Sequence, residues 1–292
     1  MYPLLRVVYA ILNLFSFSGL QRLGRILGST MYYILKSRRE VAYKNCEVIG
    51  FKDDAKRIVK SSFKHTFSAY MESFYSKRID QKFIDEMVEV EHISGKPFEE
   101  RGYFMVSAHF GGWELAPYFM TKKLGLKGAA VARKIKDKKV DEFLIKQRAN
   151  SDMEYIHHRG ATDGIKEHIN KNHSIGVLLD HSSMAKDSMI VPLFGIDTSF
   201  IKGIPLLSVR RDYPILPIFV LRKDHGFKLI VYPVIMPNKT LKPKERAFDV
   251  AKKINETYED IIKKYPDQWY LIHKRFKRIG DKNGNLVTGI YK

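Results

Sequence analysis

The stretch Tyr103-Phe-Met-Val-Ser-Ala-His109-Phe-Gly-Gly-Trp-Glu114 carries most of the information about the fold. Its first six residues are apolar or small, which is typical of a buried strand. The strand ends at His109, and the pair Gly111-Gly112 allows a tight turn into a helix that begins at about Glu114. A strand that turns directly into a helix is typical of α/β proteins, in which ligands bind at the carboxyl ends of the strands.

The rest of the chain alternates in the same way from about residue 89 onward. Short apolar runs predict strands at Val88–Ile93, Tyr103–Ala108, Gly128–Ala132, Met153–Ile156, Ile175–Leu179, Met189–Leu193, Ile215–Leu221 and Phe227–Val234. Helical patterns lie between several of them, near 114–124, 137–150, 162–171, 203–212 and 244–265. We therefore expect an α/β domain over residues 41–292, with a mostly parallel twisted sheet covered by helices.

Composition sets limits on the class of protein. The chain has 292 residues, 45% of them hydrophobic, and a formal net charge of +19. Such a chain can bury a core, and its positive charge predicts an anionic partner: acidic lipid, nucleic acid or a phosphorylated substrate. The single cysteine, Cys46, excludes an internal disulfide framework and any metal site that needs two thiolates.

Residues 1–40 combine apolar segments with basic charge. They hold six basic side chains and one acidic residue, Glu40. The apolar run Leu4–Leu20 is 17 residues long, includes Arg6 and Asn13, and is followed closely by a second amphipathic segment. This length is marginal for crossing a bilayer. We expect two short membrane-associating helices, broken near Ser18-Gly19, that lie in one leaflet; a helical hairpin packed on the rest of the protein is the alternative.

His109 and Glu114 are the candidate catalytic pair. If the turn brings Glu114 back, its carboxylate accepts from one ring nitrogen and leaves the other free to take a proton from a hydroxyl. The spacing alone fits an ordinary histidine at a strand end and a glutamate at a helix start equally well. The chain has no G-x-S-x-G, H-E-x-x-H, Walker or G-x-G-x-x-G motif.

The segment His109-Phe-Gly-Gly-Trp-Glu114 resembles the H-x4-D/E signature of the glycerolipid acyltransferase superfamily, in the form found in its lipid A late acyltransferase branch. Further segments resemble that family in the same order, over roughly residues 1–280. They are Ala132-Arg133-Lys134 followed by Val140-Asp141, His158-Arg159-Gly160, Leu178-Leu179-Asp180-His181, Pro192-Leu193-Phe194-Gly195 with Thr198 and Gly203, and the stretch from Pro266-Asp267-Gln268-Trp269 to Phe276-Lys277. His181 stands where the family usually has glutamine, and Phe276 where it has tryptophan.

The resemblance implies transfer of a fatty acyl group from an acyl carrier protein or acyl-CoA thioester to a hydroxyl of a lipid A precursor or related membrane glycolipid. It implies that His109 is the general base and Glu114 its orienting group. Substrate binding falls to Arg133, Arg159, Gly160 and Asp180, with Arg159 the first candidate for stabilising the oxyanion. It also implies peripheral or monotopic attachment to an anionic membrane surface, at the cytoplasmic face of the cell inner membrane, and neither a metal nor another cofactor.

Other classes of function remain open from the sequence. A non-catalytic basic protein that binds membranes or nucleic acid would also explain the charge, although the chain shows no nucleic-acid recognition motif, so we expect no nucleic-acid partner. An esterase is closer in chemistry, because water would take the place of the acceptor hydroxyl.

Overall fold

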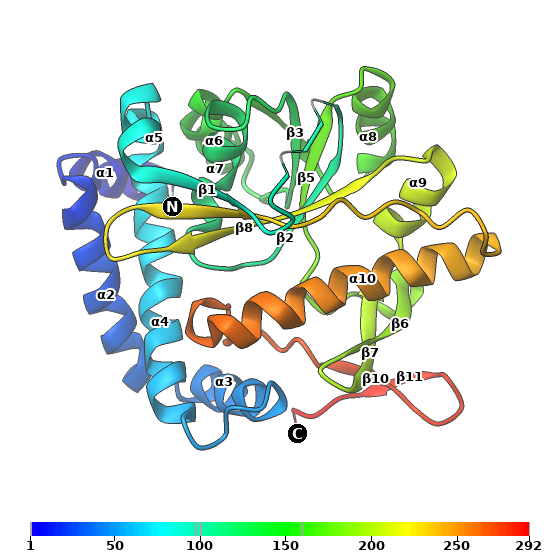
Figure 1. Ribbon diagram of the computed structural model, residues 1–292. Coiled ribbons are helices and arrows are strands. Elements are labelled where there is room, and N and C mark those ends of the chain that lie inside the picture. The colour runs from blue at the N-terminus through cyan, green and yellow to red at the C-terminus, as the bar shows by residue number, and fades with distance from the viewer. Residues whose placement is uncertain (1, 97, 100, 159, 292) are drawn as a thin grey trace.

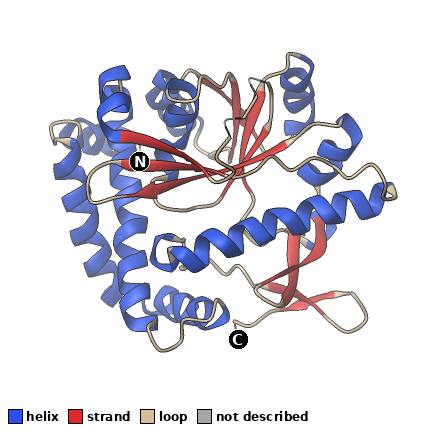
Figure 2. Cartoon of the chain, viewed as in Figure 1, coloured by secondary structure: helices blue, strands red, loops and turns tan. Residues whose placement is uncertain are grey.

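The computed structural model describes residues 2–96, 98–99, 101–158 and 160–291, which form two β-sheets and the helices around them (Figure 1, Figure 2). Its α-helices are α1 (Tyr2–Leu12), α2 (Phe17–Ile34), α3 (Lys36–Val48), α4 (Ala55–Glu72), α5 (Gln81–Met87), α6 (Ala116–Lys122), α7 (Lys138–Arg148), α8 (Ala161–Asn170), α9 (Gly203–Arg211) and α10 (Pro243–Lys264). Its strands are β1 (Val88–His92), β2 (Phe104–Ser107), β3 (Gly128–Ala132), β4 (Met153–His157), β5 (Ser174–Leu178), β6 (Ser188–Leu193), β7 (Ile196–Ile201), β8 (Ile215–Arg222), β9 (Phe227–Val231), β10 (Arg278–Gly280) and β11 (Leu286–Thr288).

The larger sheet has the strand order β1-β9-β8-β2-β5-β3-β4. Its neighbouring strands are parallel except for β8 and β9, which pair antiparallel. Side chains alternate between the two faces: Phe104 and Val106 join a core that includes α10, whereas Met105 joins a core that includes α6. A buried parallel sheet covered on both faces is what continuous apolar strands predict, so the predicted α/β fold with its mostly parallel sheet is confirmed.

A second, smaller sheet has the order β11-β10-β7-β6 and is antiparallel. The strand predicted at Met189–Leu193 therefore belongs to this sheet and not to the parallel one. Its end is a two-residue turn of Phe194 and Gly195, with φ of 50° and 73°, which returns the chain as β7. Two successive positive φ values are the geometry of the tightest hairpin turns. β7, β10 and β11 are strands that the sequence pattern did not predict.

The break between the first two helices does not lie near Ser18-Gly19, as the sequence predicts. The break lies between α1 and α2, where the Ser16 side chain accepts a hydrogen bond from the Gly19 backbone N–H and caps α2. α2 lies against α4 (Figure 1), and a Cβ at Gly24 or Gly28 would come within 2.5 Å of the backbone of α4. Glycine at these two positions therefore lets the two helix backbones approach closely.

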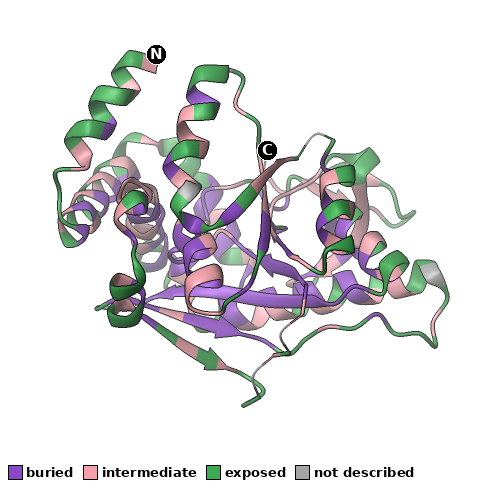
Figure 3. Cartoon of the chain, turned by 90° about the horizontal axis from the view of Figure 1, so that it is seen from above, coloured by how far each residue is buried: buried purple, intermediate pink, exposed green. Residues whose placement is uncertain are grey.

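Apolar side chains on α1 remain exposed. Leu4 is 68% exposed and Ile11 52%, and Leu14 just beyond the helix is 85% exposed. Figure 3 shows α1 as a largely exposed helix at the edge of the molecule. Among the described helices, none combines the length and apolar character that crossing a bilayer requires.

A buried ion pair joins these helices to the large sheet. The Glu72 carboxylate at the end of α4 accepts two hydrogen bonds from the Arg222 guanidinium, at 3.0 and 2.6 Å, and a third from Gln21 on α2. Arg222, at the end of β8, also hydrogen-bonds the His65 ring and donates to the carbonyl oxygen of Gly111. The turn that follows His109 is thus held from the side of the N-terminal helices.

We expect Glu72→Gln to lower the free energy of unfolding by about 3–5 kcal/mol, because it leaves the buried Arg222 charge without its counter-ion. Urea denaturation followed by circular dichroism measures the change. The control is Glu256→Gln, which removes an exposed carboxylate paired with Lys252 on α10 and should cost under about 1 kcal/mol. Equal stabilities of the two variants would contradict this account of the ion pair.

Candidate active site

The site forms where β2 and β5 end side by side. The two strands are parallel neighbours with Ser107 opposite Leu178, so the residues two positions further on, His109 and Asp180, face each other at the carboxyl edge of the sheet. His109 Nδ1 lies 2.8 Å from Asp180 Oδ1, and the His109 backbone N–H donates to Oδ2 at 3.1 Å. This is the edge at which ligands bind in α/β proteins.

Asp180 is the carboxylate that orients His109. Its side chain is 3% exposed, and it accepts a further hydrogen bond from the Trp269 indole N–H at 3.1 Å. Burial raises the pKa of the Asp180 carboxyl, but the adjacent His109 and these hydrogen bonds lower it more, so that the pKa lies well below its ordinary value. Asp180 therefore stays ionised and holds a proton on Nδ1, which leaves Nε2 as the acceptor nitrogen.

The expected contact between Glu114 and His109 is corrected by the structure. Glu114 lies in a short 3-10 helix, η2 (Trp113–Leu115), where its Oε2 accepts from Arg148 Nη2 at 3.1 Å. Gly111, with φ of 54°, and Gly112 turn the chain, and their backbone N–H groups donate to Gln268 and Val220. The turn leads Glu114 toward the end of α7 instead of back to the imidazole.

Glu114 and Arg148 nevertheless face the same space as His109. Burial lowers the pKa of Arg148, but the Glu114 charge and nearby tyrosines outweigh this effect and raise the pKa above its usual value. The pair is therefore an ionised, hydrogen-bonded unit. It supplies a fixed cation at one wall of the site.

These groups line a cavity of about 770 Å³, which we call the His109 cavity. Its walls include the apolar side chains of Met105, Val131, Leu144, Met153 and Val177. Arg133, Lys134 and Lys136, which follow β3, also line it, so the predicted substrate residue Arg133 lies at the site. A cavity with apolar walls and a few polar groups is typical of a small-molecule or acyl-chain site.

The other predicted site residues have different places. Arg159 lies outside the described residues. Gly160 adopts φ of 76° directly before α8 and is not among the described residues that line the His109 cavity. Asp180 lies at the site, but its contact is with His109.

Three histidine rings form a stack at the site, and the sequence does not predict this stack. The ring of His109 stacks on His181 with centroids 4.0 Å apart, and His181 stacks on His273 at 3.8 Å. Burial is the main cause that lowers the pKa of His181 to about 4 and of His273 to about 3. Both rings are therefore neutral near pH 7.

One ligand atom each of His109, Asp180 and His181 lies within 4.8 Å of the other two. Imidazole and carboxylate are ligands that zinc accepts, and these three are the described residues that come closest to a metal site. His109 would then lose the free nitrogen that a general base needs, so a metal site and a general base at His109 exclude each other.

The comparisons with known proteins agree with the sequence motifs. A family model described as bacterial lipid A biosynthesis acyltransferase matches residues 4–278. The lipid A biosynthesis lauroyltransferase of Escherichia coli (strain K12) is 24% identical over 268 residues, which cover 88% of this chain and 84% of that protein. The lipid A biosynthesis palmitoleoyltransferase of the same strain is 23% identical over 277 residues, which cover 87% of this chain and 84% of that protein.

Among solved structures, the 1-acyl-sn-glycerophosphate (LPA) acyltransferase of Thermotoga maritima aligns with a TM-score of 0.38 and 15% identity. The alignment covers 82% of this chain and 97% of that one.

The lowered pKa of His181 predicts a dependence of stability on pH. The pKa of His181 in the folded protein, about 4, is below its ordinary value of 6.5, so the unfolded chain takes up this proton first. The contribution of this lowered pKa to the free energy of unfolding is complete above about pH 6.5 and is lost as the pH falls toward 4. When the pH falls from 7 to 5, we expect the free energy of unfolding of His181→Gln to decrease by about 1–2 kcal/mol less than that of wild type. Urea denaturation at each pH measures the difference. His225→Gln changes an exposed histidine, so its free energy of unfolding should decrease as much as that of wild type. An equal decrease in all three proteins would refute the prediction.

Proposed function

Because the chain belongs to the bacterial lipid A biosynthesis acyltransferase family, we propose that it transfers a fatty acyl group from a thioester donor to a hydroxyl of a lipid A precursor or related glycolipid. The printed names of two relatives, a lauroyltransferase and a palmitoleoyltransferase, support a fatty acyl group as the cargo. The donor in this proposal is an acyl carrier protein or acyl-CoA. The observation that carries the proposal is the hydrogen bond between His109 and Asp180 at the wall of an apolar cavity.

In the proposed reaction, His109 acts as the general base. Its Nε2 takes the proton of the acceptor hydroxyl while the hydroxyl oxygen attacks the thioester carbonyl carbon. The tetrahedral intermediate then collapses, the carbon–sulfur bond breaks, and the leaving thiolate takes the proton back from the imidazolium. Asp180 holds the ring in the productive tautomer and stabilises its positive charge, as the carboxylate of a hydrolase triad does.

Glu114 has a different part in this proposal from the one its motif suggested. It fixes the Arg148 guanidinium at the wall of the His109 cavity, where a cation can stabilise the oxyanion of the intermediate. Arg133 would bind an anionic group of the substrate, and Arg159 with Gly160 stays a proposed substrate-binding turn on the strength of the motif. The apolar walls of the cavity would hold the acyl chain.

The proposed place of action is the cytoplasmic face of the inner membrane, with residues 1–40 as the membrane-associating segment. The exposed apolar side chains of α1 and the basic residues of the same segment support this part of the proposal. Apolar groups that enter the lipid boundary, together with cations near acidic headgroups, both favour binding to an anionic bilayer.

We expect His109→Ala and Asp180→Asn each to lower kcat of acyl transfer by roughly 10²- to 10⁴-fold, because the first removes the base and the second its orienting charge. Asp180→Asn should also move the acid limb of the kcat/KM profile to lower pH, since an imidazolium without its carboxylate is less stable. Glu114→Gln should leave the pH of that acid limb unchanged. The double variant Glu114→Gln/Arg148→Gln should have a kcat no lower than that of Glu114→Gln alone. Mass spectrometry of the acylated glycolipid measures the rates, and circular dichroism checks folding. A limb that moves with Glu114→Gln and not with Asp180→Asn would restore Glu114 as the orienting group.

For membrane binding, we expect the double variant Leu4→Asp/Ile11→Asp to bind vesicles that contain phosphatidylglycerol at least about tenfold more weakly than wild type, because each apolar side chain buried in lipid contributes about 1.5–3 kcal/mol. Vesicle sedimentation measures the binding. Phe248→Asp changes a comparably exposed apolar residue on α10 and serves as the control. Unchanged binding of the double variant would remove α1 from the membrane-associating segment.

A further inference from the structure

A second cavity, of about 620 Å³, lies between α3 and the C-terminal part of the chain. We call it the basic cavity, because Arg38, Lys44, Lys274 and Lys277 line it together with His273 and Tyr291. It shares none of its lining residues with the His109 cavity. Its volume is in the range of ordinary small-molecule sites.

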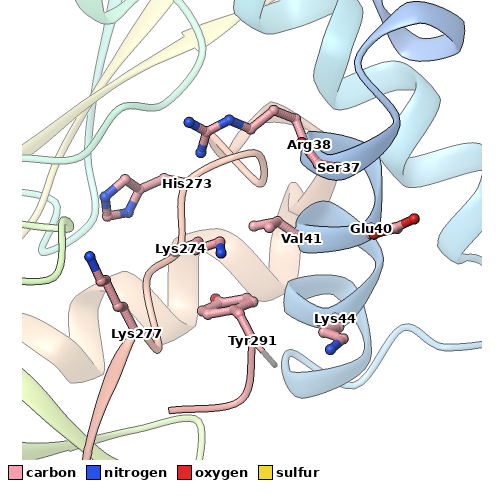
Figure 4. A pocket seen from close by; sticks show the side chains of 9 residues that line it. All are labelled: Ser37, Arg38, Glu40, Val41, Lys44, His273, Lys274, Lys277 and Tyr291. Atoms are coloured by element: carbon pink, nitrogen blue, oxygen red, sulfur yellow. The ribbon is translucent and has the colours of Figure 1, made fainter. Parts of the chain in front are cut away.

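Among the described residues that line the basic cavity, Glu40 is the one acidic residue. Figure 4 shows Arg38, Lys274 and Lys277 directed around the space beside His273, while the carboxylate of Glu40 points to the other side of α3. Among the described residues, none of these three cations has a side-chain carboxylate within ion-pair distance, whereas Lys252, Lys253, Lys263 and Lys264 on α10 each have one. Cations gathered at one cavity repel one another, and an anionic ligand relieves that repulsion.

The basic cavity borders the His109 cavity through the histidine stack. His273 lines the basic cavity, His181 lines the His109 cavity, and the two rings stack at 3.8 Å. His181 stacks in turn on the proposed base, His109. The stacked rings of His181 and His273 therefore lie at the boundary between the two cavities.

The two cavities differ in the chemistry that they offer. The His109 cavity has apolar walls for an acyl chain, and Arg133, Lys134 and Lys136 for the anionic part of its carrier. The basic cavity is lined by one guanidinium, of Arg38, and three ammonium groups, of Lys44, Lys274 and Lys277, and Val41 also lines it. An arginine fork with nearby lysines suits the oxygens of a phosphate monoester.

We propose that the basic cavity binds a phosphate group on the sugar headgroup of the acceptor glycolipid and thereby presents the acceptor hydroxyl to His109. This assignment rests on the proposed acyl transfer, because only then is there an acceptor to place. It makes Arg38, Lys274 and Lys277 binding residues for the acceptor, and it leaves the thioester to the His109 cavity.

The test uses the double variant Lys274→Gln/Lys277→Gln and the single variant Arg38→Gln in the full chain. With a phosphorylated glycolipid acceptor we expect the double variant to raise the acceptor KM about tenfold or more while kcat and the donor KM stay near wild type. With the same acceptor after phosphatase treatment, wild type and double variant should have equal KM values. Arg210→Gln/Arg211→Gln removes the same charge from exposed positions on α9, which lies far from α3 in Figure 1, and should behave as wild type.

Other outcomes would overturn the assignment in distinguishable ways. A rise in the KM of acyl-CoA or acyl carrier protein, with the acceptor KM unchanged, would give the basic cavity to the phosphate of the donor. Unchanged KM values for both substrates, or the same rise in the acceptor KM for the α9 control, would show that the cavity is not a phosphate site.

Calorimetry with inorganic phosphate and pyrophosphate judges the cavity separately from the reaction. We expect wild type and the α9 control to bind one of these anions more tightly than the double variant does. If wild type transfers no acyl group but binds the anion in this way, the proposed function fails while the phosphate site stands. Equal anion binding by all three proteins would overturn the site itself.

Discussion

The buried carboxylate of Asp180 is the group on which the site depends. An ionised side chain that is 3% exposed must be matched by donors, because an unpaired buried charge is very costly. The donors come from two distant parts of the chain: the backbone and ring of His109, and the indole of Trp269. The same three hydrogen bonds therefore fix the end of β2 against the end of β5, bring the C-terminal segment over the sheet edge and set the orientation of the His109 ring. The position of the His109 ring and the proton on its Nδ1 follow from one interaction.

The N-terminal helices support this arrangement from the opposite side of the turn. Arg222 contacts both Glu72 at the end of α4 and the carbonyl oxygen of Gly111, two residues after His109. α2 is packed on α4 closely enough that Gly24 and Gly28 admit no side chain. The segment proposed to lie in the membrane is thus connected, through Gln21, Glu72 and Arg222, to the turn that directs Glu114 toward Arg148. The proposed membrane segment and the site belong to one continuous packing arrangement.

The sequence predicted most of the large sheet, and it predicted His109 correctly as a residue at a strand end. Apolar runs such as Tyr103–Ala108 define buried strands, and that signal is local. It did not predict that β5 lies beside β2, because strand order depends on contacts between segments about 70 residues apart. The sequence therefore predicts Glu114, five residues away, as the partner of His109, and not Asp180. Once the register of Ser107 opposite Leu178 is known, the pairing of His109 with Asp180 follows directly. β10 and β11 have three residues each, and β7 has the polar run Asp197-Thr198-Ser199 at its centre, so their apolar pattern is weak.

The stack of His109, His181 and His273 places neutral rings between two groups of cations. Burial lowers the pKa of His181 and of His273, and the buried Arg275 guanidinium lowers both further, so neither ring carries charge near pH 7. A charged ring at either position would repel the cations of the basic cavity and would compete with His109 for the negative charge of Asp180. Since both rings stay neutral, neither competes with His109 for the charge of Asp180. A glutamine at position 181, as the sequence motif has it, would also be neutral, so the histidine here preserves the charge of the site while adding a ring that stacks on His109, the proposed base.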